Sequence, residues 1–233
     1  MLRYLLLTAA ALMLAMTVGT RSASALEEPP PPFPATVLDM STMERSGPTT
    51  DSDIIDVFFR GDDVYVVDVV EGEAPDGGSG LWYELDDGGY IYSRYAAPRV
   101  AGYGNWVDVN LTDMTISAMV GDEPVYTSFV VTGRPGWDTP VGTFNVLRRV
   151  PDETMDGATI GISPDSSEYY YFEGVLYTQY FTEDGAALHY NYWEPDSDFG
   201  VDQSSRGCVG LMLDDAAYFW DFAELGSVVD VHY

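Results

Sequence analysis

The feature that most constrains the fold is a series of short runs rich in valine, isoleucine and aromatic residues, each closed by glycine or aspartate. The first runs, from residue 53 onward, are IIDVFF, DVYVVDVV, LWYEL and GYIYSRY, separated by RGDD, APDGGSG and DDGG. Runs of this length and composition between such turns predict antiparallel strands rather than helices. This segment of the chain is therefore expected to be β.

A second set of strand-like runs follows residue 103 and includes WVDVNL, MTISAMV and VYTSFVVTG. The turns between these runs are short, as in a meander of hairpins. Helical periodicity occurs only in DDAAYFWDFAELG, which has Asp214 and Asp215 near its start and Gly226 near its end. We expect a mainly β chain with one short helix near its C-terminus.

The first residues have the layout of an export signal. Arg3 precedes an apolar run from Leu5 to Val18, and the small residues of an ASA motif end at Ala25. This arrangement is typical of a cleavable secretory signal. A membrane anchor is the alternative, but the run is shorter than the ~20 residues that span a bilayer. We predict a signal over 1–25 and an exported protein without an integral membrane span after cleavage.

The remaining chain divides by composition. Residues 26–52 begin with EEPPPPFP and stay polar, which favours a solvated, extended spacer; a proline-rich recognition site is the alternative. Residues 53–102 are near the lower limit for an independent core, which suits a small barrel. Residues 103–233 would form a second, larger domain.

Charge narrows the range of partners. The formal net charge is -28, from 38 acidic and 10 basic residues, and all the basic residues are arginine. Such a surface disfavours binding to nucleic acid and to anionic lipid. We attribute it to a solvated acidic surface, and we expect no nucleic-acid partner.

Cys208 is the only cysteine, and exported proteins usually pair their structural cysteines. An unpaired thiol can form a disulfide with another molecule, lie inert in the core, or serve as a reactive group. With only two histidines, the chain has too few ligands for a Cys/His zinc site, and neither a metal nor another cofactor is expected.

His189, which lies upstream in GAALHYNYW, makes the reactive alternative concrete. A histidine next to a thiol takes its proton and can later protonate a leaving amine. Gly207 allows close approach of a substrate to the backbone, and the N–H groups around Cys208 can hold an oxyanion. His232, the penultimate residue, is expected to have a surface or edge role.

The segments TPVGTF, ALHYNYW and FGVDQSSRGCVGL, followed by a helix and a closing strand, together resemble an L,D-transpeptidase catalytic domain of the YkuD type. The similarity spans about 105–233. It implies a mixed, mainly β sandwich with a short C-terminal helix, so that 103–233 would be the catalytic domain. It also implies a cysteine acyltransferase that acts on peptidoglycan stem peptides.

The resemblance implies a role for each matched residue. Cys208 would be the nucleophile and His189 the base, with the backbone carbonyl of Tyr190 orienting the imidazole. Gly207 and Cys208 would supply oxyanion-hole amides. Ser205 would brace the loop. The pocket for the substrate would be lined by Trp193 and Tyr180.

Two positions depart from the family pattern. Arg206 stands where a histidine is common, and Gly210 stands where an asparagine or arginine is usual. An arginine beside the thiol loop is expected to favour the thiolate electrostatically. Gly210 lacks a side chain that in the family helps to organise the loop or the substrate.

The segment LWYELDDGGYIYSRYAAP resembles the end of bacterial SH3-like domains, so 53–102 would be such a barrel. Its aromatic residues Trp82, Tyr83, Tyr90 and Tyr92 are equally compatible with a plain core.

Two other segments are expected to be structural. Asp196, Asp198 and Asp202 suggest a solvated acidic loop more than a calcium site, because the EF-hand order fails. The aromatic segment SEYYYFEG, which includes three consecutive tyrosines, is expected to alternate between core and surface on a strand rather than form a platform for sugars.

The expected function is that of an exported L,D-transpeptidase of the cell wall or periplasm, with a part in cell wall biogenesis and cell shape. Two alternatives remain open: an L,D-carboxypeptidase that uses water as acceptor, and a catalytically weak peptidoglycan-binding protein. A secreted cysteine peptidase of another fold would instead cleave ordinary L,L peptides.

Overall fold

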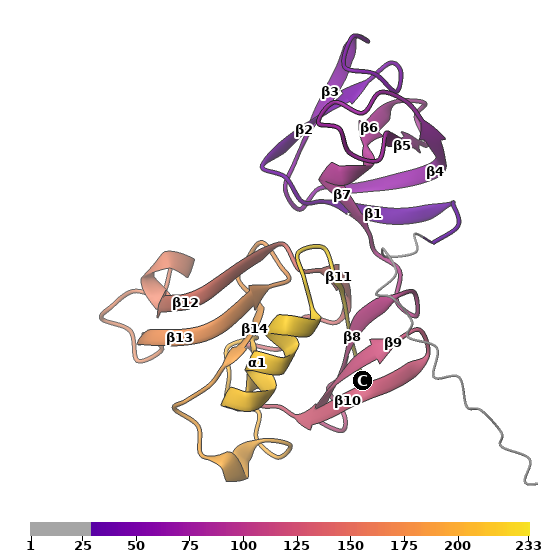
Figure 1. Cartoon of the computed structure of the whole chain (residues 1–233). Coiled ribbons are helices and arrows are strands. Elements are labelled where there is room, and N and C mark those ends of the chain that lie inside the picture. The colour runs from indigo at the N-terminus through magenta and orange to yellow at the C-terminus, as the bar shows by residue number, and fades with distance from the viewer. Residues whose placement is uncertain (1–28) are drawn as a thin grey trace, which may run out of the picture.

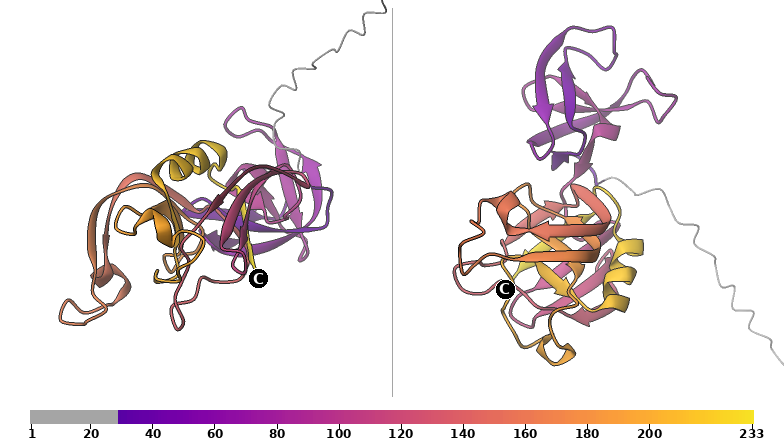
Figure 2. Two further views of the ribbon diagram at one scale, coloured as in Figure 1. Left: turned by 90° about the horizontal axis from the view of Figure 1, so that it is seen from below. Right: turned by 90° about the vertical axis from the view of Figure 1, so that its left-hand side faces the viewer.

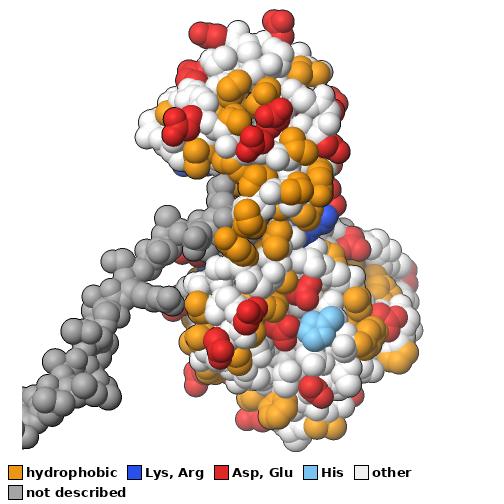
Figure 3. All heavy atoms as spheres, turned by 90° about the vertical axis from the view of Figure 1, so that its right-hand side faces the viewer, with side chains coloured by type: hydrophobic (Ala, Val, Ile, Leu, Met, Phe, Trp, Pro, Cys, Tyr) orange, Lys and Arg blue, Asp and Glu red, His pale blue; other side chains and the backbone are white. Residues whose placement is uncertain are grey.

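A computed structural model describes residues 29–233, and the predicted signal over 1–25 lies outside the described residues. Figure 1 shows an N-terminal β domain and a second domain that contains two sheets and the helix α1 (Leu213–Phe222). Within 29–233, no helix has the length and apolar composition needed to cross a bilayer. On the face shown in Figure 3, acidic side chains are spread over both domains and few basic ones are visible.

The N-terminal domain is one antiparallel sheet of seven strands in the order β3-β2-β6-β5-β4-β1-β7. Its core contains Phe33, Val37, Tyr83 and Ile91, and Trp82 is also buried. Of the four aromatic residues singled out in this segment of the sequence, Trp82, Tyr83 and Tyr92 are therefore buried. The SH3-like barrel remains a prediction. The strands are β1 (Phe33–Val37), β2 (Ser41–Arg45), β3 (Ile54–Phe59), β4 (Asp63–Glu71), β5 (Leu81–Leu85), β6 (Tyr90–Tyr92) and β7 (Ala96–Pro98).

The predicted spacer over 26–52 is wrong for the segment that forms β1 and β2. β1 pairs with both β4 and β7, and β2 pairs with β3 and β6. Phe33, Ala35 and Val37 occupy alternate positions and are all buried, so they complete a core that begins before Asp53. The prolines obscured this alternation in the sequence.

The second domain has two sheets, in the orders β10-β9-β8-β16-β11 and β12-β13-β14-β15. Most neighbours are antiparallel, but β16 lies parallel to β8 and β15 parallel to β14. The expectation of a mainly β fold with one short helix is confirmed. The strands are β8 (Asn105–Asn110), β9 (Thr115–Val120), β10 (Glu123–Phe129), β11 (Gly142–Asn145), β12 (Arg148–Asp156), β13 (Tyr171–Tyr180), β14 (Ala187–Tyr190), β15 (Val209–Leu211) and β16 (Val228–His232).

The core of this domain lies where both sheets and α1 meet. Val107 and Val109 of β8 face Leu188 of β14 and Leu211 of β15 within one buried cluster. Phe219 contributes from α1, on the apolar stripe that a helix period produces. This packing places the adjacent parallel strands β14 and β15 in the middle of the domain, where they carry the candidate site.

The two domains are in contact (Figures 1 and 2). Asn145 Nδ2 donates hydrogen bonds to the carbonyl oxygen of Pro98, at 2.9 Å, and to that of Gly226, at 2.8 Å. On another side of the contact, Gly61 in the β3–β4 turn lies against the side chain of Glu183 in the β13–β14 turn. The N-terminal domain therefore reaches the turn that borders the candidate site.

Candidate functional site

A cavity of about 710 Å³ opens in the second domain. Both chemically reactive residues from the sequence, His189 and Cys208, line it. Tyr190 is not part of the lining, but it contacts His189 directly. The other predicted site residues all line the same cavity, namely Tyr180, Trp193, Ser205, Arg206 and Gly207.

His189 is 2% exposed and stands on β14, directly opposite Gly210 of β15. Its Nδ1 lies 2.9 Å from the carbonyl oxygen of Tyr190. Because a carbonyl oxygen only accepts, Nδ1 carries the proton and Nε2 keeps a free lone pair in the neutral ring. Burial lowers the pKa of His189 to about 4, so the imidazole is neutral near pH 7.

Cys208 immediately precedes β15, and its Sγ donates to the carbonyl oxygen of Gly185 at 3.7 Å. Burial raises the pKa of the thiol to about 11; the backbone hydrogen bond from Ala187 opposes this rise, and the charge of Asp184 contributes to it to a smaller extent. The resting site therefore holds a protonated thiol and a neutral imidazole rather than an ion pair.

The loop before Cys208 is held by its own hydrogen bonds. Ser205 Oγ donates to the carbonyl oxygen of Cys208 at 2.6 Å and accepts from the Gly207 N–H at 3.2 Å. Gly207 has a φ of 104°, in the left-handed region that a side chain disfavours. Ser205 thus holds both Gly207 and Cys208, and the Gly207 N–H is engaged at rest.

Arg206 does not act on the thiol as its position in the sequence suggested. Its Nη2 lies 3.6 Å from Oε2 of Glu168, which Arg134 also contacts, and its guanidinium lies over the Tyr170 ring. Arg206 is not among the groups that lower the pKa of Cys208. The expected stabilisation of the thiolate is wrong because the guanidinium is turned toward Glu168, where it ties down the loop.

Gly210 leaves space that another residue fills. A Cβ atom at this position would lie 2.6 Å from Nδ2 of Asn191, so Asn191 can pack this closely only because residue 210 is a glycine. Asn191 is buried and was missed in the sequence. Strand alternation could have found it, because it lies two residues after His189 and therefore on the same side of the chain.

One wall of the cavity is a stack of aromatic rings. The ring centroids of Trp193 and Phe172 are 3.8 Å apart, and the angle between the two ring planes is 4°. Trp193 also stacks on His189, with ring centroids 5.6 Å apart. Tyr170 also stacks on Phe172, with ring centroids 5.8 Å apart. Tyr171 is exposed, so the aromatic segment does alternate, although its inward side faces the cavity.

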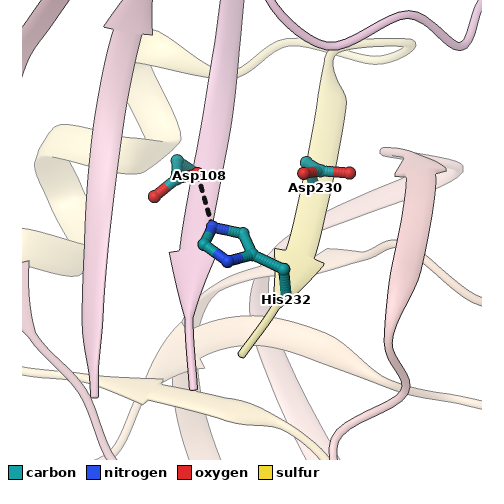
Figure 4. A group of neighbouring side chains, drawn as sticks. All are labelled: Asp108, Asp230 and His232. Carbon is teal, nitrogen blue, oxygen red and sulfur yellow. Dashed lines mark hydrogen bonds and ion pairs between the residues drawn. The ribbon is translucent and has the colours of Figure 1, made fainter. Parts of the chain in front are cut away.

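Two groups of side chains in the described part of the chain could hold a metal ion. Asp108, Asp230 and His232 on β8 and β16 form one (Figure 4), in which His232 Nε2 lies 2.9 Å from Asp108 Oδ1. None of the three lines the cavity. In the acidic loop, Asp198 and Asp202 form the second group with Glu194, and Asp196 is not part of it.

Comparison with known proteins matches this domain to one family. The model of the YkuD family, the L,D-transpeptidase catalytic domain, matches residues 104–231. L,D-transpeptidase 1 of Mycobacterium tuberculosis is 32% identical over 99 residues, which are 42% of this chain and 39% of that protein. The chain thus matches about two fifths of the length of this relative.

Solved structures share the fold. An L,D-transpeptidase from Mycobacterium smegmatis is 24% identical, with a TM-score of 0.53, and the match covers 62% of this chain and 72% of that one. An L,D-transpeptidase in complex with imipenem is 20% identical, with a TM-score of 0.55, and the match covers 73% of this chain and 90% of that one. At these identities the likeness establishes the fold alone.

Proposed function

Since the chain belongs to the YkuD family of L,D-transpeptidase catalytic domains, we propose that it is an exported L,D-transpeptidase that cross-links peptidoglycan stem peptides through a thioester on Cys208. The observation that carries the proposal is the placement of Cys208 and His189 in one cavity. His189 lies on β14 and Cys208 directly precedes the adjacent parallel strand β15, and the Tyr190 carbonyl leaves His189 Nε2 free to take a proton. No metal or other cofactor enters this chemistry.

In the first half-reaction, Cys208 Sγ attacks the carbonyl carbon of an L,D amide near the end of a tetrapeptide stem. Nε2 of His189 takes the thiol proton as the S–C bond forms, which suits a pair that is neutral at rest. The C–N bond then breaks, and the same proton passes to the departing amine. A D-amino acid leaves, and the stem remains bound as a thioester.

The oxyanion that forms in this step needs donors. The backbone N–H groups of Gly207 and Cys208 are the proposed ones. The Gly207 N–H bond to Ser205 Oγ is long, at 3.2 Å, so it can be exchanged for one to the oxyanion. Trp193 and Tyr180 would border the bound stem, since both line the cavity.

In the second half-reaction an acceptor resolves the thioester and regenerates the thiol. An amine from another stem gives a cross-link, whereas water gives the L,D-carboxypeptidase outcome. A catalytically weak wall-binding protein would form no thioester.

The test is to incubate the mature protein with a disaccharide tetrapeptide and to identify dimer and tripeptide products by mass spectrometry. Cys208→Ala should abolish both products, because no other thiol is present in the chain. Imipenem, bound in a related structure, serves as a second probe and should add its mass to the native protein but not to Cys208→Ala.

Two results would contradict the proposed function. If native Cys208 gains no adduct from imipenem or iodoacetamide while the unfolded protein is alkylated, the thiol is inert and the binding-protein alternative replaces the enzyme. Cleavage of L,L peptides at the same rate as L,D amides would instead indicate a peptidase of another specificity.

A further inference from the structure

The cavity is lined by more carboxylates than cations. Its arginines are Arg60, Arg148 and Arg206. Its acids are Asp138, Glu153, Asp156, Glu183, Asp184 and Glu194. An excess of carboxylates in a hollow surface concentrates cationic ligands near it.

Most of these acids are engaged by the protein itself. Glu153 lies 3.8 Å from Arg148, and Glu194 accepts from Ser204 at 2.8 Å. Asp138 and Asp156 accept from backbone N–H groups nearby. Glu183 and Asp184 are different, because neither forms a hydrogen bond or ion pair with any of the described residues.

These two carboxylates lie next to the nucleophile. They occupy the turn between β13 and β14, and the following residue, Gly185, accepts the hydrogen bond from Cys208 Sγ. The charge of Asp184 is close enough to raise the pKa of the Cys208 thiol. A carboxylate at this place opposes formation of the thiolate, so it works against the first half-reaction.

The nearby His189 indicates that a ligand belongs here. His189 is only 2% exposed, although it lines the cavity. Its Nε2 has no hydrogen-bond partner among the described residues. Glu183, Asp184 and His189 all line the cavity that contains Cys208.

We propose that Asp184, assisted by Glu183, binds the ammonium group of the acceptor beside the thioester and so favours aminolysis over hydrolysis. This inference rests on the proposed function and assigns its second half-reaction. It favours the transpeptidase outcome over the carboxypeptidase outcome, because a carboxylate that binds a cation holds an ammonium-bearing acceptor near the thioester but does not hold neutral water there.

The protons balance in this step. The bound ammonium releases one proton to solvent and becomes a nucleophilic amine. Its nitrogen attacks the thioester carbonyl, and Nε2 of His189 accepts a second proton from it. The C–N bond forms, the C–S bond breaks, and Sγ departs and takes that proton from His189, which restores the resting thiol.

The test measures how the thioester partitions. Wild type and Asp184→Asn are incubated with the tetrapeptide donor and increasing concentrations of an amine-bearing stem, and dimer and hydrolysed tripeptide are quantified by mass spectrometry. The dimer-to-tripeptide ratio should fall about fivefold in Asp184→Asn, in the range expected for loss of an exposed ion pair. Acylation by imipenem should be unchanged or faster, since a charge that opposes the thiolate is removed.

The matched control is Asp165→Asn, which removes an equal charge from an exposed residue outside the cavity and should leave the ratio unchanged. Glu183→Gln provides a second variant and should lower the ratio less than Asp184→Asn does. An unchanged ratio in both variants, or a wild type that acylates but yields only tripeptide, would overturn the inference. A wild type that forms no thioester contradicts the proposed function itself.

Discussion

At the scale of single residues, the candidate site combines a neutral base with a neutral thiol. The Tyr190 carbonyl fixes the tautomer of His189, and burial holds both side chains uncharged near pH 7. A buried ion pair would instead have to offset the desolvation cost of both charges. The nucleophile is therefore expected to form only when a substrate brings Cys208 and His189 into the same proton transfer.

This protonation state predicts how alkylation of Cys208 depends on pH. Only the thiolate reacts, and a raised pKa leaves little thiolate at neutral pH, so the rate should keep rising from pH 7 to pH 10. Asp184→Asn removes one of the causes and should shift the profile to lower pH. The measurement is the rate of iodoacetamide labelling followed by mass spectrometry. A plateau below pH 8 would contradict the protonated resting thiol.

At the scale of elements, the contact between β14 and β15 determines how the site is packed. Gly210 lies opposite His189 in the parallel pair, and the side chain of Asn191 fills the space above it. The departure from the family pattern at Gly210 is thus accompanied by a buried asparagine directly after β14. The same two strands carry the base and, just before β15, the thiol, so their spacing sets the geometry of both.

Gly210→Ala should be destabilising because its Cβ would lie 2.6 Å from Asn191 Nδ2 and 3.0 Å from Asn191 Cβ. Overpacking of this kind costs about 1–3 kcal/mol. Asn191→Ala removes Nδ2 but keeps Cβ, so it should relieve part of the cost when combined with Gly210→Ala, and a double-mutant cycle of urea unfolding should show a coupling between the two sites. Additive effects of the two substitutions would argue against the steric account.

At the scale of the whole molecule, the N-terminal domain is packed against the catalytic domain near the site. Gly61 lies against Glu183, and Arg60 lines the cavity itself. The second contact is Asn145, which bonds to the carbonyl oxygens of Pro98 and Gly226. The cavity is therefore completed by a domain that the family match at 104–231 does not include.

Asn145→Ala should destabilise the docked molecule, because two partly buried carbonyl groups lose their donor. The expected loss is about 2 kcal/mol, which corresponds to a fall in Tm of about 4–8 °C for a chain of this size. The measurement is differential scanning calorimetry. The control is Asn105→Ala, which changes an exposed asparagine at the start of β8. Equal effects of the two variants would show that the contact between domains adds little.

Local patterns in the sequence were sufficient for much of the fold and for part of the site. Alternating apolar residues and turn residues predicted most strands, and a single helical period predicted α1, because these signals depend only on neighbours along the chain. The same patterns missed β1, where prolines concealed alternate buried positions, and β2, whose buried alternate positions are the polar Thr42 and Glu44.

By itself, the sequence determined that the chain is mainly β and that its family is that of L,D-transpeptidase catalytic domains, and it indicated Cys208 and His189 as the candidate reactive residues. Only the tertiary structure decided that Arg206 turns to Glu168 and that Asp184 borders the thiol. The physical reason is that charge and burial at the site depend on segments far apart in sequence, which meet only after the sheets have packed.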